Sequence, residues 1–150
     1  MYLFSIRLFI LLATFGFCFK LQATEQPFIE VISSDLFPIT GIQDLQGQGY
    51  LVNVYNLDDG KRLVTQIGSN LPHNQEAAKK VLQQWFKKIG NRQVKVQFKK
   101  AYQAVTISTQ YGLTRYPAVV FNHGESVVYG ETNIVQALRH YQQWKVKHED

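Results

Sequence analysis

Apolar residues recur with two different periods along the chain, and together they predict an α/β protein. Short runs rich in β-branched and aromatic residues predict strands at 28–32 and 50–55. Apolar positions three and four residues apart predict a short helix at 63–67, a longer helix from 72–76 to Gly90, and a helical segment over 92–111. The alternation at 94–98 also fits a strand, and we favour the helix.

The last third of the sequence predicts a β-hairpin followed by a helix. Residues 118–121 and 126–129 are β-rich and are joined by a connection of four residues, 122–125. Asn133 and Gln136 form a variant of the capping box, and the apolar stripe that follows predicts a final helix. Pro38 and Gly41 favour a loop or one helical turn over 35–41. This order predicts a mixed sheet covered by helices.

The amino-terminal segment predicts export. An apolar run at 8–19 follows Arg7, and Lys20 ends it well short of the roughly 20 apolar residues that a membrane-spanning helix needs. Ala23 offers a small residue at a cleavage position, so we interpret 1–23 as a secretory signal peptide. We therefore expect a periplasmic protein with one domain at 24–150 and no membrane span after cleavage.

Composition and charge narrow the function further. The chain has 150 residues and a formal charge of +5, with a pI of about 9.3, a balance that raises nucleic acid as a partner. Cleavage after Ala23 leaves 127 residues with 14 basic and 11 acidic side chains. The net charge of +3 weakens the argument for a nucleic-acid partner. The single Cys18 leaves with the leader, so the mature chain has no thiol for a disulfide or a cysteine-rich zinc site.

The predicted order of elements, with a proline directly before the third strand, resembles the thioredoxin-like fold. The resemblance implies that Pro117 is cis and faces the loop after the first strand; the alternative is a trans proline that starts an edge strand. Thioredoxins that exchange disulfides carry two cysteines in that loop, where residues 34–37 here read Ser-Asp-Leu-Phe. A hydroxyl cannot replace a thiolate in thiol exchange, so redox catalysis is excluded and the loop is a degenerate, cysteine-free active-site loop.

A narrower resemblance is to small exported proteins encoded by integrating conjugative elements. It is carried by five segments, 29–33, 37–41, 101–103, 111–121 and 127–132, and the last two are the most specific. The resemblance implies a non-enzymatic periplasmic component of a conjugative type IV secretion system. The role that we expect is an assembly or scaffold factor that binds another envelope protein.

The candidate binding site combines the two proline-containing segments. We expect Phe37, Pro38, Tyr116 and Pro117 to line a groove in which a strand edge accepts an extended peptide. The alternative is that all four residues only pack the fold. No catalytic residue, metal or cofactor is predicted.

Two other functions stay open. Lys88, Arg92, Lys95 and Lys99 have helical spacing and could contact DNA phosphates or an anionic membrane, although a solvated helix face is the simpler interpretation.

An envelope enzyme could instead use Ser33 or Ser34 with Asp35 and a distant histidine, but no Gly-x-Ser-x-Gly motif accompanies them. The four histidines lack the spacing of a helical zinc site. They are His73, His123, His140 and His148.

Overall fold

A computed structural model describes residues 26–148 of the protein. The predicted signal peptide at 1–23, with Cys18, lies outside the described residues. The strands are β1 (Ile29–Ser33), β2 (Val52–Asn56), β3 (Ala118–Phe121) and β4 (Ser126–Tyr129). The helices are α1 (Ile42–Gly47), α2 (Asp59–Ser69), α3 (Gln75–Ile89), α4 (Asn91–Ala101), α5 (Gln103–Gln110) and α6 (Ile134–His148), with a 3₁₀ turn η1 (Asn122–Gly124) in the hairpin.

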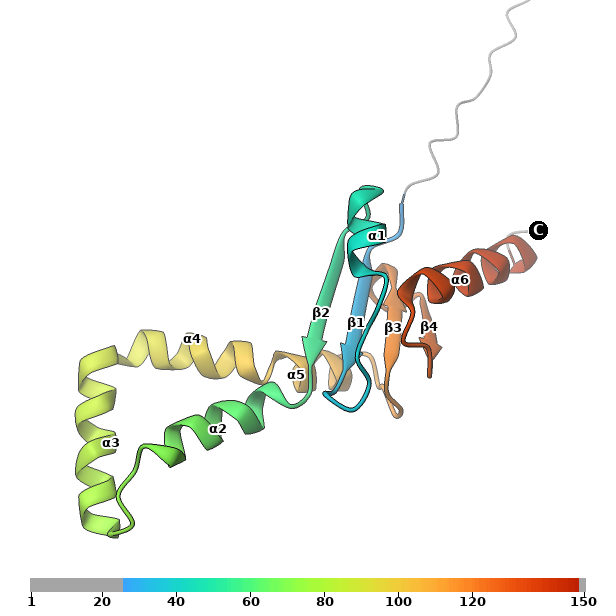
Figure 1. Ribbon diagram of the computed structural model, residues 1–150. Helices are drawn as coiled ribbons and strands as arrows, with labels where there is room; N and C mark the ends of the chain where they lie inside the picture. Colours follow the sequence, from blue (N-terminus) through green and yellow to red (C-terminus); the bar gives the residue numbers. More distant parts are fainter. Residues whose placement is uncertain (1–25, 149–150) are drawn as a thin grey trace, which may run out of the picture.

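The four strands form one mixed sheet in the order β2-β1-β3-β4 (Figure 1). β1 pairs in parallel with β2 and antiparallel with β3, and β3 pairs antiparallel with β4. Only β3 runs against the other three strands, and this is the thioredoxin-like arrangement that the sequence predicts. The Tyr116–Pro117 peptide bond is cis, as the resemblance implies.

Each face of the sheet has its own hydrophobic core, because alternate residues of a strand point to opposite faces. On one face, Ile29, Val31 and Phe121 pack with Leu45 of α1 and with the apolar stripe of α6. On the other face, Ile32, Ala118 and Val120 pack with Ala104 of α5 and with Leu113. Helices therefore cover both faces of the sheet.

Local signals explain where two of the longer helices begin. The Asn74 side chain accepts a hydrogen bond from the Ala77 N–H at 3.1 Å and caps α3, which ends at Gly90 as predicted. The Asn133 side chain caps α6 by accepting from the Val135 N–H at 3.0 Å. The reciprocal half of the predicted capping box is wrong, because the Asn133 N–H donates to Glu131 instead of Gln136.

Three expectations need correction. The helical segment predicted over 92–111 is two helices, α4 and α5, which meet at Tyr102. Helix α1 was not predicted, and it follows the expected loop directly after Gly41. The strand after Pro117 is not an edge strand, because β3 pairs with both β1 and β4, so its backbone between Ala118 and Phe121 has no open side.

Helices α2, α3 and α4 form an arm that projects from the sheet (Figure 1). We call residues 59–101 the helical arm. It is inserted between β2 and α5; α2 leads outward, α3 runs across the far end and α4 returns toward the sheet. Within residues 26–148, none of the helices combines the length and apolar character required to cross a bilayer.

Candidate functional site

The candidate site lies at the end of the sheet where β1 and β2 both terminate. Parallel strands in α/β proteins present their carboxyl ends at the same edge, and ligands commonly bind there. The pairing of Ile32 with Ala118 brings the segment before β3 to this edge as well. Three segments therefore meet here: the loop 34–41, the junction of β2 with α2, and Tyr116–Pro117.

A polar network fixes the first part of the loop to the β2–α2 junction. The Asp35 N–H donates to Asp58 at 2.9 Å, and the Asn56 side-chain amide donates to the Asp35 carboxylate at 2.8 Å. Arg62 of α2 forms an ion pair with Asp35 and a second one with Asp59. These contacts join the loop after β1 to residues more than twenty positions further along the chain.

The other end of the loop is fixed to the start of α6. Thr40 donates its N–H to the Thr132 carbonyl at 2.9 Å and accepts from the Ile134 N–H at 3.1 Å. Inside the loop, the buried Ser33 hydroxyl donates to the Phe37 carbonyl at 2.6 Å. Hydrogen bonds therefore hold the loop at both ends and across its middle.

The fixed loop presents apolar side chains to solvent. Leu36 is 83% exposed and Phe37 is 39% exposed, and Pro38 is exposed as well. A surface cavity of about 740 Å³ lies beside Leu36 and is otherwise lined mainly by polar residues. They are Ser34, Asp35, Asp58, Lys61, Arg62, Thr65 and Gln66.

Electrostatics favour the charged form of the loop carboxylate. Hydrogen bonds from the Arg62 guanidinium, and then from Asn56, hold the pKa of Asp35 below its ordinary value. The same contact raises the pKa of Arg62. The two groups therefore stay ionised across the physiological range.

The four residues of the predicted groove share this end of the sheet but differ in exposure. Phe37 and Pro38 are exposed on the loop, whereas Pro117 is buried and Tyr116 packs partly against the core beneath α5. The Pro117 carbonyl accepts from the Gly130 N–H at 2.8 Å, so it is not open to a peptide. That the four residues line a groove stays a prediction.

The serine chemistry considered for an enzyme finds little support in this geometry. The Ser33 hydroxyl is committed to the Phe37 carbonyl, and the Asp35 carboxylate to Arg62 and Asn56. In the part of the chain that the structure describes, no histidine hydrogen-bonds to Ser33 or Ser34.

The predicted basic stripe is divided between two helices. Lys88 belongs to α3, whereas Arg92, Lys95 and Lys99 lie on α4, beyond the turn at Gly90 where φ is 83°. Among residues 26–148, no group of three or more His, Cys, Asp and Glu side chains is placed to hold a metal ion.

A buried carboxylate that sequence reasoning missed lies in the middle of the sheet. Glu30 of β1 is 5% exposed; it accepts hydrogen bonds from the hydroxyls of Tyr55, at 3.3 Å, and Tyr111. The His123 Nδ1 lies 3.7 Å from the same carboxylate. The signal for this cluster is a charged residue between the apolar residues Ile29 and Val31 of a strand.

The Glu30 cluster shifts the titration of its tyrosines. Burial, followed by the hydrogen bond to the carboxylate and its charge, raises the pKa of Tyr111 to about 12. Burial and the charge of Glu30 also raise the pKa of Tyr55. Both phenols therefore remain protonated donors at neutral pH, which is the state that satisfies a buried carboxylate.

Comparisons with known proteins give one match. The model of a family described as "Protein of unknown function (DUF1525)" matches residues 29–147. Neither the curated proteins nor the solved structures gave a match. Because the family model extends from the start of β1 almost to the end of α6, the chain belongs to the DUF1525 family.

Proposed function

We propose that the protein is a non-enzymatic periplasmic component of a conjugative type IV secretion system, encoded by an integrating conjugative element. In this proposal it is an assembly or scaffold factor that binds another envelope protein through the loop after β1. The setting in conjugation is supported by the resemblance of segments such as 111–121 and 127–132. The binding role is supported by the loop itself.

The observation that carries the binding role is a run of exposed apolar residues on an immobilised loop. Leu36, Phe37 and Pro38 are consecutive and exposed, although such runs are unfavourable on a surface that stays in water. The loop is held by Asp35 on one side and Thr40 on the other. A surface fixed before binding loses less conformational entropy when a partner covers it.

Cysteine is absent from 24–150, so the scaffold has no thiol with which to act on a partner. The loop after β1 can still act as a binding surface. Exposed Leu36 and Phe37 supply apolar anchors, and the charged residues Asp35 and Arg62 beside them supply a polar rim.

The test replaces the two anchors and measures both binding and DNA transfer. Leu36→Ser with Phe37→Ser should lower conjugative transfer, and should reduce by about ten-fold or more the yield of photo-crosslinks from a probe at Pro38 to an envelope protein. Leu51→Ser is the matched control, because Leu51 is 70% exposed but precedes β2 at the opposite end of the sheet. It should change neither readout.

Normal transfer and normal crosslinking by the folded double variant would contradict the proposal. A loss of transfer on Ser34→Ala, with crosslinking unchanged and with ester or peptide hydrolysis that disappears in the same variant, would favour the enzyme instead. Circular dichroism of each purified variant establishes that the fold is retained.

A further inference from the structure

We propose that the helical arm is a second docking site, separate from the loop after β1, and that it receives an amphipathic α-helix of a partner protein. The partner helix carries an apolar face flanked by aspartate and glutamate residues. The inference goes beyond the loop site and does not use its exposed apolar residues Leu36, Phe37 and Pro38 as contacts; Gln66 of α2 lines the cavities of both sites.

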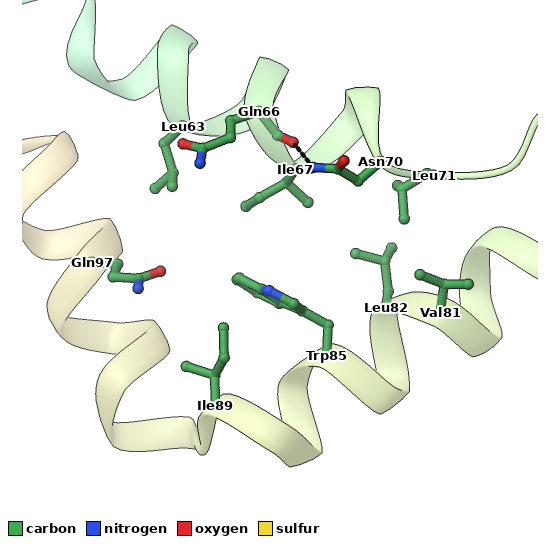
Figure 2. A pocket seen from close by; sticks show the side chains of 10 residues that line it. All are labelled: Leu63, Gln66, Ile67, Asn70, Leu71, Val81, Leu82, Trp85, Ile89 and Gln97. Carbon is green, nitrogen blue, oxygen red and sulfur yellow. Dashed lines mark hydrogen bonds between the residues drawn. The ribbon is translucent and has the colours of Figure 1, made fainter.

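The arm encloses an apolar cavity of about 440 Å³ between α2, α3 and α4 (Figure 2). Its apolar lining consists of Leu63, Ile67, Leu71, Val81, Leu82, Trp85 and Ile89. Figure 2 shows the side chains of α2 and α3 directed toward one another, with the Trp85 ring between them and Gln97 approaching from α4. The polar side chains Gln66, Asn70 and Gln97 complete the lining.

The apolar stripes of the arm are not covered by the rest of the molecule. Neither α3 nor α4 contains a buried residue, and Gly60 is the one buried residue of α2. The helices that pack on the sheet differ, since α1, α5 and α6 each bury side chains. An amphipathic helix in a folded domain normally buries its apolar stripe against another element. The apolar surface of the arm can therefore be covered by a further helix.

The charge of the arm indicates what that element carries. Residues 59–101 contain ten basic and two acidic residues, a net charge of +8 in a chain whose total is +5. Within residues 26–148, the eight basic residues of α3 and α4 take part in no ion pair. The positive charge is therefore concentrated on the arm, where, within residues 26–148, Arg62 is the one basic residue that forms an ion pair.

Some of these charges lie beside the cavity. Lys100 lines an adjoining cavity that shares Leu63, Gln66 and Gln97 with the first one. Lys88 follows Trp85 by three residues, and positions three apart lie on the same side of a helix. An apolar centre flanked by ammonium groups is complementary to an apolar helix face flanked by carboxylates.

The shape of the cavity favours a helix over a membrane or nucleic acid. The apolar side chains converge on Trp85 inside a concavity, which can receive a row of side chains from one helix face. A helix that lies on a bilayer must direct its apolar side chains outward. Single-stranded nucleic acid stacks its bases on accessible aromatic rings, whereas the Trp85 ring lies among the aliphatic side chains of the cavity (Figure 2) and packs edge-on against Phe86.

The experiment uses the full mature protein and two labelled synthetic peptides. Both peptides place leucine at i, i+3, i+4 and i+7; one has glutamate on the flanks, and the other has lysine. Fluorescence anisotropy should show at least ten-fold tighter binding of the glutamate peptide, with an affinity that falls as salt is added. Equal binding of the two peptides, or no binding of the glutamate peptide, would overturn the proposal.

Two pairs of substitutions locate the binding. Lys88→Glu with Lys100→Glu should weaken binding of the glutamate peptide at least ten-fold. Lys80→Glu with Lys87→Glu makes the same change in net charge but, at about 100° per residue, lies on the side of α3 opposite Trp85, so it should weaken binding less than three-fold. Equal losses in the two pairs would overturn the cavity as the binding site. All four lysines are exposed, so the fold should tolerate both pairs.

Two further measurements separate this inference from other partners and from the loop site. The two double variants, Lys88/Lys100 and Lys80/Lys87, should not differ in their binding to vesicles of phosphatidylglycerol and phosphatidylcholine. They should not differ in their binding to duplex DNA either. The proposal would be overturned if the native protein did not bind the glutamate peptide and if the Lys88/Lys100 double variant alone lost binding to vesicles or to DNA. That ligand would then be the favoured partner of the arm. Leu36→Ser with Phe37→Ser should leave peptide binding unchanged, so each site can fail without the other.

Discussion

At the scale of single residues, the least expected feature is the carboxylate of Glu30 inside the sheet. A buried charge is costly unless donors satisfy it, and here the donors come from Tyr55 on the neighbouring strand and from Tyr111 at the end of α5. His123 lies beside the same carboxylate and packs against Phe28 in a tilted arrangement, with 4.6 Å between the ring centroids. The cluster therefore fastens α5 and the hairpin turn to the central strand.

Tyr111→Phe should destabilise the protein by about 1.5–3 kcal/mol, the usual cost of losing a hydrogen bond to a charged group. Urea denaturation at pH 7 measures this loss. Tyr102→Phe is the control, because the Tyr102 hydroxyl makes no hydrogen bond within residues 26–148. Equal stability of the two variants would mean that Glu30 does not depend on Tyr111.

The same residue predicts a dependence on alkaline pH. The pKa of Tyr111 is raised to about 12 in the folded protein, above its ordinary value of 10.0. The stabilisation is therefore complete below pH 10 and is lost as pH rises from 10 toward 12, because the unfolded state loses its proton first. The free energy of unfolding, measured by urea denaturation at several pH values between 8 and 11, should decrease less with rising pH for Tyr111→Phe than for the native protein.

At the scale of elements, the loop after β1 depends on a glycine at its end. Gly41 has φ of 82°, in the left-handed region that glycine tolerates. A Cβ atom there would lie 2.9 Å from Val135 Cγ2 and 3.2 Å from the Asn133 side-chain oxygen. The close approach allows Thr40 to form its bridge with Asn133 and positions α1 against α6.

Gly41→Ala should cost about 1–3 kcal/mol, because alanine is strained at this φ and would also collide with Val135. Thermal and urea denaturation check the value. Gly47→Ala supplies the matched control on α1: it is helical and has no atom within 4 Å of the added Cβ, so it should be neutral or slightly stabilising. A Gly41→Ala protein as stable as the native chain would show that the loop end adapts freely.

At the scale of the whole molecule, the sheet and the arm differ in how they are stabilised. All residues of β1 and β3 are buried, and helices cover both faces of the sheet. The arm packs mainly on itself, through α2 with α4 and α3 with α4, and its apolar side chains remain partly exposed. The local free energy of opening should therefore be lower in the arm than in the sheet.

Hydrogen exchange measured by mass spectrometry tests this difference. Amides of α3 and α4 should exchange at least ten times faster than those of β1 and β3, and the glutamate-flanked peptide should slow exchange in the arm alone. Exchange from α6, which is docked on the sheet, is the internal reference. Uniform protection of arm and sheet would mean that they unfold as one unit.

The sequence alone determined the elements whose signals are local. Short runs of β-branched and aromatic residues located the strands, and apolar residues at helical spacing located α3 and α6. The absence of cysteine leaves residues 24–150 without a thiol for exchange, whatever the fold. The order of elements, with Pro117 before the third strand, was enough to predict a thioredoxin-like mixed sheet. These elements can be predicted because residues close to one another in the sequence determine them.

Tertiary structure decided which distant residues meet. Tyr111 lies 81 positions from Glu30, and Arg62 lies 27 positions from Asp35, so neither contact leaves a local pattern. The same holds for the division of 92–111 at Tyr102 and for the cavity around Trp85, whose lining comes from three helices. Periodicity identifies the apolar face of a helix. What that face contacts depends on the fold, because the fold determines which elements lie beside the helix.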